Sequence, residues 1–185
     1  DKAAEKAKQM VDFERSVAKL MLTNEEDRNP NISYNPQTMA ELSKLVKNIN
    51  KLTYVSYDGF IEMDNLRNNY DSVLELDCKD ITTEDKFWFY FGLYFNFPTR
   101  VDNWAAFSDW MRDLAFWDRN KSILIIFKNV DELFCRNLTL QSLAMSVFWE
   151  EVLPYWENEV IKVTSGSMQP RQFDVYCVMS QYDDF

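Results

Sequence analysis

Histidine is absent from the 185-residue sequence, and glycine occurs only three times. The absence of histidine excludes Ser-His and Cys-His nucleophile pairs and removes the commonest metal ligand. The three glycines, Gly59, Gly92 and Gly166, lie far apart, whereas a loop that cradles phosphate groups needs several glycines in a short run. The sequence therefore argues against histidine-based catalysis and against nucleotide binding through such a loop.

Long apolar runs and closely spaced cysteines are also missing. No apolar run approaches the roughly 18–20 residues of a membrane span, and residue 1 does not begin a signal peptide. Cys78 and Cys177 lie in apolar, strand-like stretches, and neither they nor Cys135 have the spacing of a metal site or a redox motif. We expect reduced, mostly buried thiols, no metal or other cofactor, no contact with a membrane, and a cytoplasmic location.

The sequence is rich in apolar and acidic side chains. Apolar residues make up 46% and aromatic residues 16%, which is enough to form the core of a globular protein. The net charge is −10: residues 1–70 carry 11 acidic and 10 basic side chains, and residues 71–185 carry 19 and 10. An acidic C-terminal part attracts basic partners and repels nucleic acid, although many ordinary soluble proteins have the same composition.

Two helices and a hairpin are predicted in the first 70 residues. Apolar side chains recur at helical spacing over residues 1–22 and Pro36–Asn48, and a polar linker, Asn24–Pro36, separates the two stretches. Lys51–Asp64 predicts a β-hairpin. Its parts would be a strand at Leu52–Tyr57, a turn at Asp58–Gly59 and a second strand at Phe60–Met63.

The remaining residues predict an α/β fold in which strands and helices alternate. The expected strands are Ser72–Asp77, Ser122–Phe127 and Phe173–Met179. The expected helices run from a cap at Thr82 or Thr83 to Phe95, over Asn103–Trp117 and over Leu138–Trp156. Pro154 is expected to bend or end the last helix. Strands separated by helices imply right-handed crossovers, and hence a small, mainly parallel three-stranded sheet packed with helices. The composition shifts near residue 70, so we expect an extension of helices and a hairpin at residues 1–69 and the α/β domain at residues 70–185.

The helix that ends at Phe95 is apolar almost all round, so either the fold buries it or a partner covers it. Burial is favoured, because the sheet and the N-terminal helices can cover two of its sides. Catalysis by paired carboxylates stays open in principle. With 30 acidic residues, however, pairs such as Glu150–Glu151 arise by chance, and a solvated face is the simpler interpretation. No active site is predicted.

The helix at residues 102–117 has an apolar side and an acidic side. With about 3.6 residues per turn, one side carries an apolar stripe made of Trp104, Phe107, Met111, Leu114 and Ala115. Asp109 and Asp113 fall on the opposite side, Asp102 is expected to be the N-cap, and Trp110 and Trp117 flank the acids. An acidic patch bordered by tryptophan is typical of an interface for a basic partner. A solvated helix face with both tryptophans folded under neighbouring loops is the equally weighted alternative.

The segment FPTRVDNWAAFSDWMRDLAFW (Phe97–Trp117) resembles the signature of barstar-like proteins, F-P-x-x-F-G-x-N-W-D-A-x-x-D-x-L-x-D-L. The matching residues are Phe97, Pro98, Asn103, Trp104, Ala106, Asp109, Asp113 and Leu114. The order of strands and helices agrees over about residues 70–180. The sequence departs from the family in lacking the glycine before Asn103, in having Ala105 where aspartate is usual, and in having Ser108 where the founding member places an aromatic contact residue.

The resemblance implies a function as well as a fold. Members of the family inhibit ribonuclease toxins, and Asp109 corresponds to the aspartate that mimics substrate phosphate in the toxin's active site. We therefore expect a protein that is not an enzyme and that forms a 1:1 complex with a cognate, basic nuclease toxin, without binding nucleic acid. The residues expected to bind the toxin are Asp102, Asn103, Asp109, Trp110, Asp113 and Trp117. Two alternatives remain: an adaptor or regulator of the same fold that binds another basic protein, and an enzyme of unrecognised carboxylate chemistry.

Overall fold

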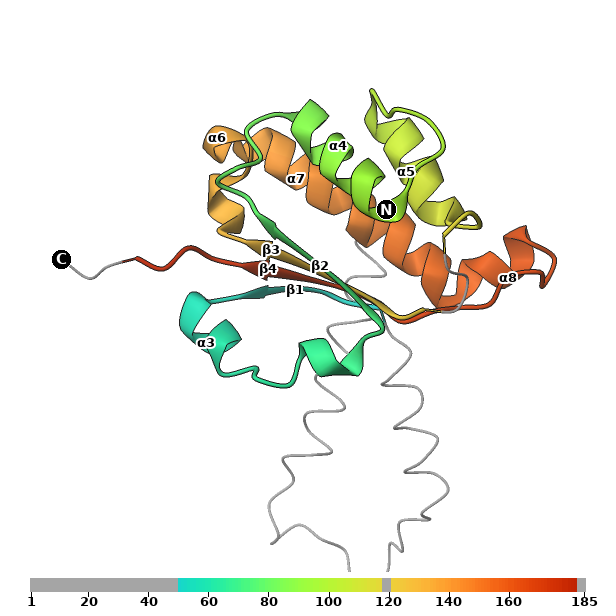
Figure 1. Cartoon of the computed structure of the whole chain (residues 1–185), viewed down its shortest axis with the longest axis horizontal. Helices are drawn as coiled ribbons and strands as arrows, with labels where there is room; N and C mark the ends of the chain where they lie inside the picture. The colour runs from blue at the N-terminus through green and yellow to red at the C-terminus, as the bar shows by residue number, and fades with distance from the viewer. Residues whose placement is uncertain (1–49, 118–120, 183–185) are drawn as a thin grey trace, which may run out of the picture. The chain divides into compact units, whose positions relative to one another are not determined.

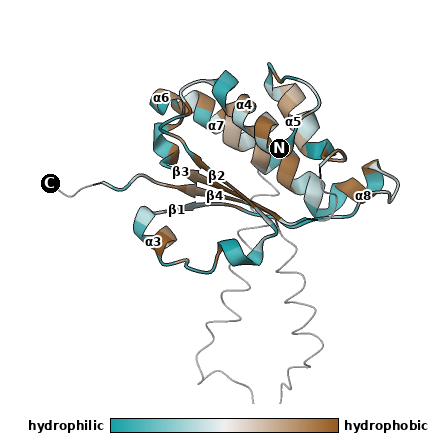
Figure 2. Cartoon of the chain, in the orientation of Figure 1, coloured by the Kyte–Doolittle hydropathy of each residue, from teal (hydrophilic) through white to brown (hydrophobic). Residues whose placement is uncertain are grey.

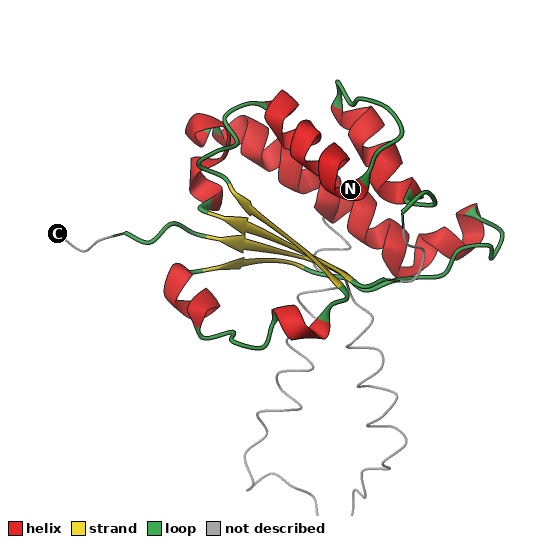
Figure 3. Ribbon diagram, in the orientation of Figure 1, coloured by secondary structure: helices red, strands yellow, loops and turns green. Residues whose placement is uncertain are grey.

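The computed structural model describes residues 50–117 and 121–182. The two helices expected at residues 1–22 and 36–48, and the linker between them, lie outside the described residues. Strands β1 (Leu52–Val55), β2 (Ser72–Asp77), β3 (Ile123–Lys128) and β4 (Phe173–Val178) form one sheet in the order β1-β4-β3-β2. All three pairings are parallel (Figures 1 and 3). This confirms the predicted α/β fold and its small parallel sheet, and adds a fourth strand to the three that we expected.

Strand β1 is the fourth strand, and it contradicts the predicted hairpin. Leu52 pairs with Val175 of β4, and the carbonyl of Val55 accepts from the amide of Met179 at 3.0 Å. The residues after β1 form the short helix α3 (Tyr57–Ile61) instead of a second strand, because the hydroxyl of Ser56 caps the helix by accepting from the Gly59 amide at 3.1 Å. A side chain at position 59 would come within 3.0 Å of that hydroxyl, so the glycine serves the cap and not a hairpin turn.

The compact unit that contains the sheet runs from Lys47 to Phe185. Strand β1 therefore folds with the sheet although it precedes the boundary that we predicted between residues 69 and 70. The position of the boundary between the family domain and the rest of the chain stays a prediction.

Helices cover one face of the sheet (Figure 1). They comprise α4 (Glu84–Phe95), α5 (Trp104–Asp113), η3 (Val130–Glu132), α6 (Leu133–Arg136), and a long helical segment made of α7 (Leu138–Ser146), η4 (Val147–Val152), η5 (Tyr155–Glu159) and α8 (Val160–Val163). Both η4 and η5 are π-helical. The long segment continues past Pro154, where we expected a bend or an end, because π-type turns on either side accommodate the missing proline N–H.

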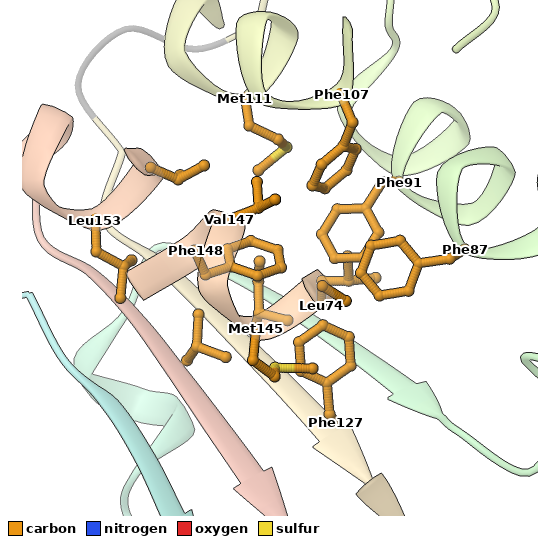
Figure 4. Packing of buried hydrophobic residues seen from close by; sticks show 14 of the residues in the cluster. Leu74, Phe87, Phe91, Phe107, Met111, Phe127, Met145, Val147, Phe148 and Leu153 are labelled. Atoms are coloured by element: carbon orange, nitrogen blue, oxygen red, sulfur yellow. The ribbon is translucent and has the colours of Figure 1, made fainter. Parts of the chain in front are cut away.

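The main core lies between this helical layer and the sheet, and Figure 4 shows aromatic rings at its centre. The ring of Phe87 lies 4.8 Å from that of Phe91 and 5.8 Å from that of Phe127 on β3. Phe87, Phe91 and Phe95 are fully buried, which confirms that the fold itself covers most of α4. Hydrophobic colour concentrates on the strands and on the helix surfaces that meet them (Figure 2).

The other face of the sheet carries a smaller core of Leu124, Ile126 and Val178. The segment that holds α3 and η2 (Arg67–Asn69) covers it, through residues such as Phe60 and Leu66. Arg67 donates from Nε to the carboxylate of Glu75 on β2, and Lys128 Nζ lies 4.0 Å from the other oxygen of Glu75. These contacts tie the covering segment to the edge strand.

The Arg67–Glu75 pair gives the unfolding free energy a dependence on pH. The hydrogen bond from Arg67 lowers the pKa of Glu75, partial burial opposes the shift, and the charges of Arg67 and Lys128 add to it. The contribution of this pair to the unfolding free energy is therefore fully present at pH values above the unfolded pKa of Glu75, about 4.3. It is lost as the pH falls through the lower pKa that Glu75 has in the folded protein. Both side chains are partly exposed, so Glu75→Gln should cost about 0.2–1 kcal/mol at neutral pH. Urea denaturation of both proteins should show this difference shrinking toward zero in acid; a constant difference would contradict the assignment.

Candidate functional site

Helix α5 and the chain on either side of it carry the predicted contact residues. The helix begins one residue later than expected, because Asn103 and not Asp102 is the N-cap: Asn103 Oδ1 accepts from the amide of Ala106 at 2.8 Å. Asp102 instead accepts from Asn103 Nδ2 at 2.8 Å. The helix ends at Asp113, not at Trp117, because Leu114 adopts a left-handed conformation with φ 46° and its amide bonds back to the carbonyl of Trp110.

The apolar stripe of α5 packs as predicted. Phe107 and Met111 are fully buried within the helix, and Leu114 is fully buried just after it. Trp104 and Ala115 are partly buried against the same core. Since the helix packs against η4 on this side, its opposite side faces outward.

Asp109 lies on the outward side of α5, with 73% of its side chain exposed. Its Oδ1 atom is 2.9 Å from Nη2 of Arg112, one turn further along the helix. Such an exposed pair contributes only about 0.2–1 kcal/mol. Arg112 therefore orients the carboxylate of Asp109 only weakly. A cation of a partner can replace Arg112 at a small cost in free energy.

Asp113 differs from Asp109 in its surroundings. It is half-buried, and its Oδ1 atom accepts from the Ala115 amide at 3.3 Å, which helps to close the end of the helix. It also lies near Tyr155 of η5: burial raises the pKa of this phenol most, and the negative charge of Asp113 raises it further. The two aspartates therefore share one side of the helix, but only Asp109 is fully available to a partner.

The two tryptophans pack against aromatic rings of the chain itself. The indole of Trp110 donates from Nε1 to Thr99 Oγ1 at 3.2 Å, and its ring lies 5.6 Å from that of Phe116. The ring of Trp117 lies 5.0 Å from that of Phe95. Both tryptophans are partly buried, which agrees with the alternative in which neighbouring segments cover them. They brace α5 and the loops on either side of it.

Sequence reasoning missed a contact between Ser108 and Glu151. Ser108 is buried, and its hydroxyl donates to the carboxylate of Glu151 on η4. A π-turn holds more residues than an α-turn, so it changes which side chains of the long helical segment face α5. Glu151 remains exposed, as the interpretation of a solvated face implies, but periodicity contains no signal for its contact with Ser108. Ser108 stands where the founding member of the family has an aromatic residue. In this chain it links α5 to η4 through the hydrogen bond to Glu151.

The family comparison agrees with this geometry. A model of the family described as Barstar (barnase inhibitor) matches residues 72–165, just over half of the chain. The chain belongs to the barstar family. A second model, described as Peptidase family M13, matches residues 1–80, of which the structure describes 50–80. No curated protein and no solved structure matches the chain.

Within residues 50–117 and 121–182, no group of three or more cysteine, aspartate or glutamate side chains could hold a metal ion. No helix in the same ranges is long and apolar enough to span a bilayer. All three cysteines are free; Cys78 and Cys177 are buried, as expected, and Cys135 is exposed. Burial raises the pKa of Cys177 to about 12, so this thiol is not a nucleophile at neutral pH.

Proposed function

We propose that this barstar-family protein is an immunity protein that binds a nuclease toxin in a 1:1 complex and blocks the basic active-site cleft of the toxin. Asp109 carries the proposal: by the resemblance it corresponds to the family aspartate, and its side chain is exposed on helix α5. A nuclease cleft is cationic because it binds phosphate, so a carboxylate held there can replace a phosphate group of the substrate. A cytoplasmic location and the absence of catalytic activity belong to the same proposal.

The remaining predicted contact residues have unequal roles in this proposal. Asp102 is exposed at the start of α5 and can meet a basic partner beside Asp109. Asn103 acts by setting the start of the helix, since its side chain is used as the cap. Trp110 and Trp117 hold the loops around α5 in place, and Asp113 closes the helix. The contact chemistry is therefore centred on Asp109.

The test begins with a pull-down from the native strain, using the full chain as bait, and identification of captured proteins by mass spectrometry. A nuclease should be captured, and the purified protein should inhibit its activity at a 1:1 ratio. Asp109→Ala should weaken binding by at least about 2 kcal/mol, or roughly 30-fold, which titration calorimetry measures. Asp64→Ala is the matched control, because Asp64 is exposed and far along the chain from α5; it should leave affinity unchanged.

Arg112 provides a second, opposite test of the same surface. Arg112→Gln removes both the internal partner of Asp109 and a positive charge that faces a basic toxin. Association should therefore become several-fold faster, and the gain should shrink as salt is added. Unchanged affinity in a protein that carries both Asp109→Ala and Asp113→Ala would refute the α5 surface. Capture of a basic protein without nuclease activity would favour an adaptor, and turnover abolished by one carboxylate change would favour an enzyme.

A further inference from the structure

The long helical segment holds α5 at two points, one in the middle of the helix and one at its end. In the middle, Glu151 accepts a hydrogen bond from Ser108. At the end, the indole of Trp156 donates from Nε1 to the carbonyl of Met111 at 2.8 Å. Met111 belongs to the last turn of α5, so the second contact fixes the part of the helix that the first does not reach.

The π-helical stretches bring both contacts to α5. Glu151 belongs to η4 and Trp156 to η5, five positions further along the chain. On an α-helix of about 3.6 residues per turn, positions five apart lie on different sides. A π-turn forms its hydrogen bonds between residues five apart, so it brings such positions toward the same side. The two π-helical stretches thus let one segment hold α5 twice.

Trp156 is itself held firmly. It is fully buried, and Arg171, which lies just before β4, contacts it in two ways. The guanidinium carbon of Arg171 lies 4.2 Å from the centre of the indole ring, and the amide of Arg171 donates to the carbonyl of Trp156 at 3.0 Å. A cation over an aromatic face in a desolvated place is a stabilising contact. These contacts fix the orientation of the indole, and with it the direction of its N–H.

The carbonyl of Met111 takes this donor because α5 ends nearby. In a continuing helix the amide of Ala115 would bond to that carbonyl. Ala115 instead donates to Asp113 Oδ1 at 3.3 Å, since Leu114 turns the chain into a left-handed conformation. Trp156 therefore caps the end of α5 from 45 residues further along the chain.

The capped turn also carries part of the acidic side of α5. Arg112 lies in this turn; it pairs with Asp109, and its Nε donates to the carbonyl of Ser108 at 3.3 Å. Fraying of the turn would move Arg112 and Asp113 and change the surroundings of Asp109. We propose that Trp156 is a positioning residue for the acidic side of α5, because its N–H fixes the last turn before a partner arrives. The consequence for toxin affinity rests on the proposed function, whereas the capping of the helix does not.

Trp156→Phe tests this role, because phenylalanine keeps an aromatic ring next to Arg171 but has no N–H for Met111. Amide hydrogen exchange of the full chain, followed by NMR, should be at least about 10-fold faster at Leu114 and Ala115, since the last turn opens more often. The complex with the nuclease captured above should dissociate about 5-fold faster or more, because binding must then order the helix end. Benzothienylalanine at position 156 has the shape of tryptophan with sulfur in place of the N–H. It should give the same results, and it covers the case in which Trp156→Phe does not fold.

Leu124→Ala is the matched control. Leu124 is fully buried in the smaller core on the other face of the sheet, so its loss lowers stability without touching α5. Local opening of the helix end does not depend on that core, and both measurements should stay unchanged.

Three results would overturn the positioning role of Trp156. The first is unchanged exchange at Leu114 and Ala115 in both position-156 variants. The second is equal effects of Trp156→Phe and Leu124→Ala, which would make Trp156 an ordinary core residue. The third is faster exchange with an unchanged rate of dissociation from the nuclease. If exchange is faster but the unchanged chain captures no nuclease, the capping by Trp156 is supported and the proposed function is refuted.

Discussion

Replacing Phe91 by alanine should lower the free energy of unfolding by about 3–5 kcal/mol, the usual range for a buried phenylalanine. Phe91 is fully buried at the point where α4, α5, η4 and β3 meet. Its ring centre lies 5.2 Å from that of Phe107 on α5 and 5.7 Å from that of Phe148 on η4. Removing the ring leaves a cavity bordered by other rings, which have little freedom to close it.

Phe89→Ala is the matched control, because the same residue type is removed from the same helix at an exposed position. Its effect should stay within about 0.5 kcal/mol. Urea denaturation followed by tryptophan fluorescence measures both variants. If the two substitutions cost the same, Phe91 is not at the centre of the core, and the packing of α4 described above is wrong.

Replacing Asn50 by alanine should cost about 2–4 kcal/mol, although the residue lies before the region of family resemblance. Asn50 is buried, and its Nδ2 donates to the carbonyls of Leu153 and Arg171, both at 3.1 Å. Its Oδ1 accepts from the amide of Phe173 at 2.9 Å. Alanine removes all of these contacts and leaves the Phe173 amide without this acceptor in the interior, which is the costly part of the change.

Asn68→Ala serves as the control for Asn50, since Asn68 is exposed; its effect should be within about 0.5 kcal/mol. A chain that starts at residue 70 gives a stronger test of whether the residues before the family match stabilise the fold. It lacks Asn50 and also β1, so the edge of β4 loses its partner strand. We expect this shortened chain to be less stable than Asn50→Ala by urea denaturation. Equal stability of the shortened and full chains would show that β1 contributes nothing to the fold.

Local signals explain why much of the fold was predictable. Strand β2 has the predicted bounds, and β3 and β4 differ from the prediction by one residue, because each is a short apolar run bounded by polar residues. Helix α4 begins after Thr83, whose hydroxyl accepts from the Lys86 amide at 3.2 Å, and this cap is visible in the sequence. The buried side of α5 follows from spacing alone.

The local geometry predicted around the site was only partly correct for a related reason, and which residues bind a toxin stays a prediction. Spacing can assign Asp109 to the outer side of α5, but it cannot tell which of several polar residues caps the helix or which cation lies nearby. Asn103 rather than Asp102 is the cap, and Arg112 pairs with Asp109. The tryptophans were expected beside the acids; the rings that cover them come from Phe95 and Phe116, whose positions depend on the packed core.

The sequence by itself determined the α/β class, three of the strands, the apolar side of α5 and the family signature around Asp109, because each depends on residues close together in the chain. Only the tertiary structure decided that Leu52–Val55 pairs with β4 rather than folding into a hairpin, and that a π-turn brings Glu151 to Ser108. Both features depend on contacts between residues that lie 43 to more than 100 positions apart in the sequence. Such contacts form when burial and hydrogen bonding over the whole core outweigh local preference, so local periodicity does not encode them.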